Sequence, residues 1–382
     1  MRILYCIPHL YNSGGMERVL TQKANWLIAH TPHEITILTT EPTPKGRKDV
    51  FFPLDPRVRV VHLNIDFNAD YSKSLFSKWC GHMRRMHAYK RALSAYIRAQ
   101  QIDLCISLCG KEIAFLHQLP CRTIAEVHFA KDQRRQLLEA THSGWLWSLL
   151  GRIRTAQLVR AIRPLERLVV LTEQDKTDWQ AAGCMNVVCI PNPCSLDAQE
   201  RPKSSDKSNT VLSVGRLHEQ KGFDLLLHAW ESIEAQFPKC SLRIVGEGPK
   251  RTELERQIVQ TGLQHAALAG KSEAIADEYA KAALFVLSSR YEGLPLALIE
   301  AMWCGVPCVA FDCPQGPAEL LAEERGWLAG NGDIQALTRQ ISYVLTHPEE
   351  AQERAMRAQL YARAHYSETA IMPQWVTLIE NG

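Results

Sequence analysis

Short apolar runs alternate with amphipathic stretches along most of the chain. Seven such runs occupy the first 191 residues, from RILYCI at 2–7 to NVVCIP at 186–191. Five more follow, from TVLSVG at 210–215 to VPCVAF at 306–311. Runs of this length, separated by helical periodicity, are typical of parallel sheets with crossover helices. The pattern predicts an α/β fold with two Rossmann-like, doubly wound domains.

A segment at 191–209 separates the two groups of runs. Its sequence, PNPCSLDAQERPKSSDKSN, is rich in proline, serine and charge, as linkers are. We expect an N-terminal domain at 1–190, a C-terminal domain at 210–365 and a last helix at 366–382 that packs back toward the first domain. Ligands of such folds bind beyond the carboxyl ends of the strands, so the two domains are expected to face each other across a cleft.

Composition adds an asymmetry of charge. The chain has 382 residues, of which 46% are hydrophobic and 22% charged, as in globular proteins with room for two cores. Residues 1–190 hold 26 of the 44 basic and 16 of the 41 acidic side chains, a net charge of +10 that leaves −7 for the remainder. The two halves are therefore expected to meet different partners.

Several classes of protein are disfavoured. No apolar run approaches the roughly 18 residues of a spanning helix. The N-terminus MRILYCIPHL resembles a first strand more than a signal peptide. The 12 cysteines form no C-x-x-C pair, so we expect reduced thiols in a cytoplasmic protein.

The stretch EGLPLALIE begins after the apolar run ALFVLSS and opens a predicted helix. Pro295 suits the first helical position, and Gly305 suits the residue after the helix end. Glu292 would then lie in a loop at a strand's carboxyl end, and Glu300 on the helix.

This placement suits a nucleotide sugar. The amides of Gly293, Leu294 and Leu296 would form a helix N-terminus that favours an anion. A carboxylate such as Glu300 can accept hydrogen bonds from two vicinal hydroxyls. The same spacing also fits a surface helix that follows a charged loop.

Two cations follow an earlier predicted strand, TVLSVG, in the stretch VLSVGRLHEQKGFDLLLHAW. Arg216 and Lys221 lie between the strand and a helix, where they could bind a diphosphate. Solvated charges on an exposed loop are the alternative.

Two further loops in the first half are candidates. Gly14 and Gly15 follow the first strand and would allow a ligand close to a helix N-terminus, although an ordinary turn fits as well. His128 lies just past the strand RTIAEVH and could contact a sugar hydroxyl, or have no role. The full G-x-G-x-x-G fingerprint is absent here and at GEGPKR, which disfavours a dinucleotide cofactor.

These motifs together resemble the retaining glycosyltransferases of family 4, which have the GT-B fold. The resemblance rests on SGGMERV, GRLHEQKG, VGEGP and SSRYEGLPLALIEAMWCGVPCVA, in this order. It implies that Arg216 and Lys221 bind the donor diphosphate, that Glu300 holds the ribose, and that Glu292 with the following amides holds the hexose. His128 and the Gly14-Gly15 loop would face the transferred sugar and the acceptor. FDCPQGPAEL is similar to a variant in bacterial enzymes that build surface polysaccharides.

The sequence therefore indicates a retaining transferase that moves a hexose or N-acetylhexosamine from a nucleotide sugar, most simply UDP-linked. The acceptor is expected to be a saccharide, lipid-linked, in surface polysaccharide or lipopolysaccharide synthesis. No cofactor or metal is expected, because the chain has no Asp-x-Asp triplet and two cations can neutralise the leaving diphosphate.

Two alternatives share the donor site. A nucleotide-sugar epimerase would need no acceptor, and an inactive GT-B partner subunit would turn nothing over. A nucleic-acid partner is not expected, because the basic half lacks the aromatic-basic motifs of the usual modules.

The basic half also suggests a membrane surface. Lys, Arg and Trp recur beside Leu and Ile at helical spacing between about 73 and 167. Such helices can lie at the interface of an anionic membrane, here the inner face of the plasma membrane. The alternative is that their apolar side packs into the core of the first domain.

Overall fold

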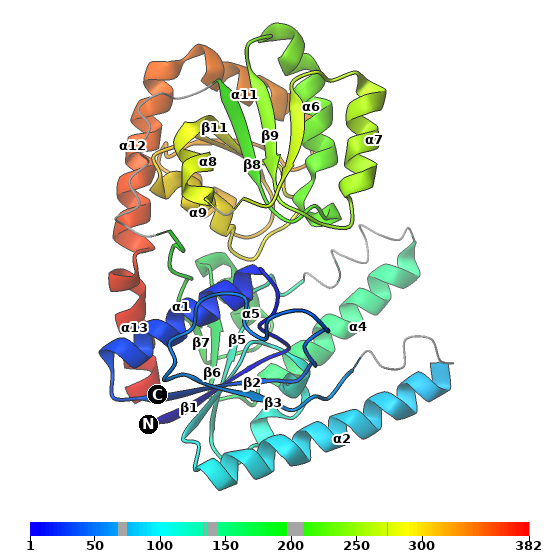
Figure 1. The fold of residues 1–382 in the computed structure, drawn as a ribbon, viewed down its shortest axis with the longest axis vertical. Coiled ribbons are helices and arrows are strands. Elements are labelled where there is room, and N and C mark those ends of the chain that lie inside the picture. Colours follow the sequence, from blue (N-terminus) through cyan, green and yellow to red (C-terminus); the bar gives the residue numbers. More distant parts are fainter. Residues whose placement is uncertain (68–74, 133–134, 136–143, 197–208, 273, 382) are drawn as a thin grey trace. The chain divides into compact units, whose positions relative to one another are not determined.

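A computed structural model describes the chain except for residues 68–74, 133–134, 136–143, 197–208, 273 and 382 (Figure 1). The chain divides into two compact units. Unit 1 comprises Met1–Arg135, Trp145–Pro191 and Ile371–Gly382, and unit 2 comprises Asn192–Ala370. Most of the predicted linker at 191–209, and parts of the basic stretch at 73–167, lie outside the described residues.

Unit 1 is built on a parallel sheet in the order β3-β2-β1-β4-β5-β6-β7. All seven strands coincide with apolar runs that the sequence predicts. Their bounds are Arg2–Ile7 (β1), Glu34–Thr39 (β2), Arg59–His62 (β3), Leu104–Ser107 (β4), Arg122–Glu126 (β5), Arg167–Val170 (β6) and Val187–Cys189 (β7).

Helices cover both faces of this sheet because its strands are apolar on both sides. Leu4 and Cys6 of β1 pack with α2, α4 and α5, while Ile3 and Tyr5 pack with α1 and α13. The C-terminal helix thus completes the core of unit 1, and its end lies near the N-terminus (Figure 1). The helices span Gly15–His30 (α1), Leu75–Gln100 (α2), Trp145–Ile162 (α4), Glu173–Ala181 (α5) and Glu368–Asn381 (α13), with 3₁₀ turns at Lys111–Ala114 (η1) and Leu116–Gln118 (η2).

Unit 2 has a second parallel sheet, in the order β10-β9-β8-β11-β12-β13. Five strands match predicted runs. The sixth, β13, is not predicted, because WLAG contains no β-branched residue and its flanks, EERG and NGD, are charged or turn-forming. The bounds are Thr210–Val214 (β8), Ser241–Val245 (β9), Ala266–Gly270 (β10), Ala282–Leu287 (β11), Cys308–Asp312 (β12) and Trp327–Gly330 (β13).

Helices also cover both faces of the second sheet. Residues of α6, α7 and α11 form one core with Val211, Leu284 and Val286. On the opposite face, α8 and α9 contact β8, β11 and β12, and Tyr279 packs against Phe285. The helices span Phe223–Gln236 (α6), Arg251–Thr261 (α7), Ile275–Lys281 (α8), Leu296–Trp303 (α9), Pro317–Leu321 (α10), Ile334–Thr346 (α11) and Pro348–His365 (α12), with a 3₁₀ turn at Glu219–Lys221 (η3).

The strand orders locate the ligand-binding edges. In unit 1 the order reverses between β1 and β4, and in unit 2 between β8 and β11. Open parallel sheets bind ligands at such switch points, beyond the carboxyl ends of the strands. The prediction of two Rossmann-like α/β domains is confirmed. Among the described residues, no helix combines the length and apolarity that crossing a bilayer requires.

Candidate functional site

An ion pair joins two loops at the switch point of unit 2. Lys221 follows β8 and Glu292 follows β11, and Nζ of Lys221 lies 2.6 Å from Oε1 of Glu292. The hydroxyl of Ser289 donates to the same oxygen over 2.5 Å. The side-chain amide nitrogen of Gln220 donates to Oε2 over 3.4 Å. Only 5% of Glu292 is exposed, and the nearby cation of Lys221 offsets part of the cost of burying its carboxylate.

A second pair ties the same loops together. The guanidinium of Arg290 donates to both carboxylate oxygens of Asp224, over 2.9 and 2.6 Å, and to the carbonyl of Glu219 over 2.8 Å. Burial opposes ionisation of Asp224, but the hydrogen bonds from Arg290 outweigh it and lower the pKa of that carboxyl. The forked geometry fixes both loops at the edge of the sheet.

Gly222 permits the close approach of these loops. Its φ is +61°, and a Cβ placed there would lie 2.0 Å from the carbonyl oxygen of Ser288. The hydroxyl of Ser288 in turn donates to the carbonyl of Lys221 over 2.9 Å. Only glycine combines this left-handed conformation with so close a backbone contact.

The second glutamate of the motif is also buried and held. Glu300 lies on α9, and the hydroxyl of Tyr279 donates to its Oε2 over 2.9 Å while Ser195 donates to Oε1. Burial, together with the charge of Glu300, raises the pKa of Tyr279 well above its usual value. A carboxylate can accept several hydrogen bonds, and the hydroxyls of Tyr279 and Ser195 fix the orientation of Glu300 on α9.

The segment between the glutamates begins α9 one residue later than predicted. Pro295 is the residue that caps the helix, and its carbonyl accepts the first helical bonds from Leu298 and Ile299. Gly293 and Leu294 therefore precede the helix, and of the three residues whose amides are expected at its N-terminus only Leu296 belongs to α9. Gly305 follows the end of α9 with φ +68°.

Arg216 completes the set in unit 2. It lies just after β8 and is exposed, and it forms no ion pair with any residue that the structure describes. Burial, with the charge of Arg216 as the next cause, lowers the pKa of the neighbouring His218. Arg216 is thus an exposed cation at this edge that could bind an anion.

The glycines predicted in the first half lie at the switch point of unit 1. Gly14 caps α1 and Gly15 is its first residue. The carboxylate of Glu17 folds back over Gly14 and lies 3.1 Å from Nδ1 of His9. The contact between Glu17 and His9 thereby closes the loop after β1 within the unit.

His128 lies beyond β5 and contacts a buried ion pair. Its Nε2 is 2.9 Å from Oε1 of Glu126, and Nζ of Lys23 is 2.6 Å from both oxygens of Glu126. Burial opposes ionisation, yet the charges of Lys23 and His128 lower the pKa of Glu126 to about 2. His128 and the glycines belong to unit 1, and the other predicted site residues belong to unit 2.

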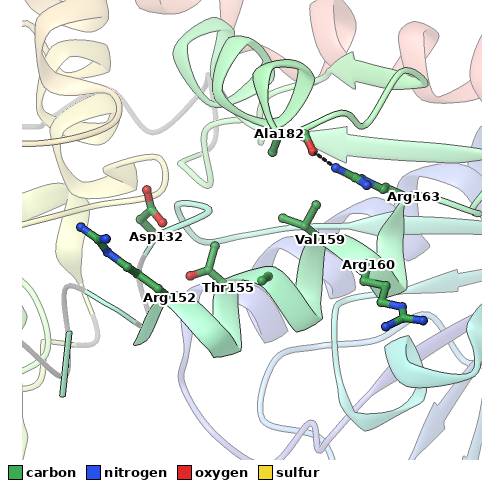
Figure 2. Close-up of a pocket in the computed structure, with 8 residues that line it drawn as sticks. Asp132, Arg152, Thr155, Val159, Arg160, Arg163 and Ala182 are labelled. Atoms are coloured by element: carbon green, nitrogen blue, oxygen red, sulfur yellow. Dashed lines mark hydrogen bonds between the residues drawn. The ribbon is translucent and has the colours of Figure 1, made fainter. Parts of the chain in front are cut away.

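A hollow of about 490 Å³ runs along α4 in unit 1. Figure 2 shows Asp132 opposite Arg152 at one end, and Arg163 turned toward the carbonyl of Ala182, to which it donates over 2.6 Å. Arg160 points away from these residues (Figure 2). Arg163 binds a backbone carbonyl and Arg160 points away, so the arginines of the hollow do not converge on one anion site.

Sequence reasoning missed the residues that support the predicted ones. Some lie far from their partners along the chain: Asp224 and Arg290 are 66 positions apart, and Ser195 and Glu300 are 105 apart. Tyr279 is nearer, 21 positions before Glu300. A signal was available only for Glu126, which precedes His128 by two residues in a strand that is otherwise apolar. The supporting residues are Ser195, Asp224, Tyr279 and Arg290 in unit 2, and Lys23 and Glu126 in unit 1.

Comparison with known proteins places this geometry in context. Residues 197–363 match the family model "Glycosyl transferases group 1". An uncharacterised glycosyltransferase of Haemophilus influenzae is 26% identical over 383 residues, which cover 98% of each chain.

A Campylobacter jejuni enzyme is also 26% identical, over 99% of this chain and 98% of its own. It is named GalNAc-α-(1→4)-GalNAc-α-(1→3)-diNAcBac-PP-undecaprenol α-1,4-N-acetyl-D-galactosaminyltransferase. Among solved structures, a TarM variant of S. aureus, in complex with fondaparinux, α-GlcNAc-glycerol and UDP, has a TM-score of 0.77 at 15% identity and covers 99% of each chain. The chain is a glycosyltransferase of the hexosyltransferase class, and its residues 197–363 are similar to the group 1 family.

Proposed function

We propose that the protein is a retaining family 4 enzyme that transfers a hexose or N-acetylhexosamine from a UDP-sugar to a lipid-linked saccharide. The observation that carries this proposal is the pairing of Lys221 with Glu292 at the switch point of unit 2, with Glu300 buried on the adjoining helix. Lys221, the backbone that leads into α9, and the buried carboxylate of Glu300 lie along one edge of the second sheet. A nucleotide sugar has a diphosphate between two hydroxylated rings.

Each residue would act on one part of the donor. Arg216 and Lys221 would bind the diphosphate and stabilise the charge that develops as it leaves. Glu300 would accept hydrogen bonds from the ribose, and Glu292 with the amides of Gly293, Leu294 and Leu296 would hold the hexose. His128 would lie next to the transferred sugar, and Gly14 and Gly15 near the diphosphate and acceptor.

The lipid-linked acceptor is supported by the surface of α4. Its first turns expose large apolar side chains, including 74% of Trp145, 46% of Leu149 and 45% of Ile153, beside the exposed Arg152 and Arg154. These side chains lie outside the core of unit 1. Other apolar residues of the stretch, including Leu93 of α2 and Leu158 and Ile162 of α4, pack into that core, as the alternative for this stretch expects. The C. jejuni relative is named for an undecaprenol-linked acceptor. We propose that α4 contacts an anionic membrane during surface polysaccharide or lipopolysaccharide synthesis.

An assay with and without acceptor separates this proposal from the alternatives. A transferase releases UDP and lengthens the acceptor, whereas an epimerase converts the UDP-sugar alone and an inactive subunit does neither. A panel of nucleotide sugars, with UDP release as readout, would identify the donor.

We predict that Lys221→Met and Glu300→Gln each lower sugar transfer by about 10–150-fold, which corresponds to losing one charge-assisted hydrogen bond. Initial rates at saturating acceptor would measure the effect. Lys239→Ala, a change of an exposed charge in the same unit, is the matched control and should retain the wild-type rate. Rates near wild type for both site variants, in folded protein, would remove the donor-site assignment.

Transfer is predicted to be independent of divalent metal. Because Arg216 and Lys221 are assigned the neutralisation of the diphosphate, EDTA should leave the initial rate within about twofold. The control is a second assay in which Mg²⁺ or Mn²⁺ is restored. Loss of activity with EDTA, and its return with either ion, would show that a metal performs this role.

Membrane binding is predicted to depend on α4. Flotation with anionic liposomes should recover the wild type at low salt and less of it as salt rises, since cations near the surface contribute about 1 kcal/mol each within a Debye length. Trp145→Ser with Leu149→Ser should reduce recovery severalfold. The control pair is Val259→Ser with Leu360→Ser, which changes two exposed apolar residues of unit 2. It should leave the recovery unchanged. A wild type that fails to float, or equal losses in both pairs, would contradict the assignment of α4.

A further inference from the structure

The ion pair between Lys23 and Glu126 is among the most deeply buried features of unit 1. The Lys23 side chain is 1% exposed and that of Glu126 is 0% exposed. Removing two charges from water is costly, and well-packed apolar residues of similar volume often give equal or greater stability. Stability alone is therefore a weak reason for a lysine and a glutamate at these positions.

The pair lies at the ligand-binding edge of the sheet. Glu126 is the last residue of β5, which neighbours β4 at the switch point, and His128 follows two residues later. Both carboxylate oxygens of Glu126 accept from Nζ of Lys23, and Oε1 also lies 2.9 Å from Nε2 of His128. The imidazole is itself only 6% exposed.

This geometry determines how the imidazole is held. A carboxylate oxygen 2.9 Å from Nε2 favours a proton on that nitrogen, and the contact limits how the ring can turn. An ionised carboxylate also holds a neighbouring N–H more strongly than a neutral one does.

Aromatic rings complete the surroundings of Lys23. Its Nζ lies 3.7 Å from the ring centroid of Trp375 and 5.7 Å from that of Tyr5. Trp375 belongs to α13, the C-terminal helix that packs into unit 1. A cation over the face of an indole is stabilised by the ring, more so when it is desolvated. The C-terminal helix thus holds the lysine that holds the carboxylate.

A second buried carboxylate in unit 1 shows that burial alone does not require a lysine. Glu112 is 2% exposed and accepts from the hydroxyls of Ser107 and Tyr89, over 2.5 and 3.0 Å. Burial raises the pKa of Glu112, whereas the pKa of Glu126 is lowered to about 2. Glu126 therefore stays ionised at neutral pH through the cation of Lys23.

We propose that Lys23, Glu126 and Trp375 are positioning residues that orient the imidazole of His128 for sugar transfer. This inference rests on the proposed function, in which His128 lies next to the transferred sugar. The C-terminal helix then contributes to activity as well as to the core, because it supplies the ring that holds Lys23.

The test is a double-mutant cycle on kcat with the full chain. Glu126→Gln should lower kcat about 10–100-fold and change the KM for the donor less than about twofold. Trp375→Leu should also lower kcat, by a smaller factor than Glu126→Gln does. In a His128→Ala background, Glu126→Gln should cost less than about twofold more, because residues that act as a unit are not additive. Glu112→Gln is the control with equal burial and should retain kcat.

A charge-free double variant and an NMR measurement keep the test valid if a single variant does not fold. Lys23→Met combined with Glu126→Gln removes both buried charges together, and it should show the same kcat loss as Glu126→Gln alone. Nitrogen-15 NMR of the histidine side chains reports the tautomer directly. It should show His128 protonated on Nε2 in the wild type and a mixture in the charge-free double variant.

Two results would overturn the inference. One is full kcat in Glu126→Gln or in the charge-free double variant. The other is an additive loss in the His128→Ala background, which would mean that Glu126 acts elsewhere. Either result would leave the proposed function intact if the wild type transfers sugar. Failure of the wild type to use any nucleotide sugar would instead contradict the proposed function.

Discussion

The contact between Lys221 and Glu292 is the interaction on which the candidate site depends. It joins loops that follow two neighbouring strands, at the point where the strand order of the second sheet reverses. Arg290 and Asp224 clamp the same loops, and Gly222 lets their backbones touch. These contacts together therefore determine the shape of this edge of the sheet.

The two units solve a similar problem with different residues. In unit 2 the cation that pairs with the buried carboxylate reaches solvent, since 18% of the Lys221 side chain is exposed. In unit 1 the pair of Lys23 and Glu126 is closed off from solvent and contacts a histidine. The first arrangement suits direct contact with an anionic ligand, and the second suits orientation of another side chain. Both occur beside the switch point of their sheet, where the parallel strands direct their loops.

Much of the fold could be predicted because its signals are local. Twelve of the thirteen strands appear in the sequence as apolar runs, while β13 is four residues long and was missed. The placement of Glu292, Glu300 and Lys221 in the fold could be predicted, because each follows a strand or lies on a helix that the pattern marks. The helix start was misplaced by one residue, since proline suits the capping position here as well as the first turn.

The supporting residues could not be predicted because their partners are distant in sequence. Ser195 and Glu300 are 105 positions apart, and Lys23 and Glu126 are 103 apart. Periodicity assigns a residue to an element but does not determine which side chains meet across elements. Trp375 is the clearest case, since only the packing of the C-terminal helix into unit 1 brings its ring to Lys23.

The central claim is that the edge formed by Arg216, Lys221 and Glu292 recognises a nucleoside diphosphate. Isothermal titration of the wild type and of Arg216→Ala with UDP and UMP, and in parallel with GDP and GMP, tests it most directly. The account predicts that one diphosphate binds at least about tenfold more tightly than its monophosphate, a difference of roughly 1.4 kcal/mol, and that Arg216→Ala reduces this difference. Equal affinity for the diphosphate and monophosphate of both bases, or no binding of either, would contradict it.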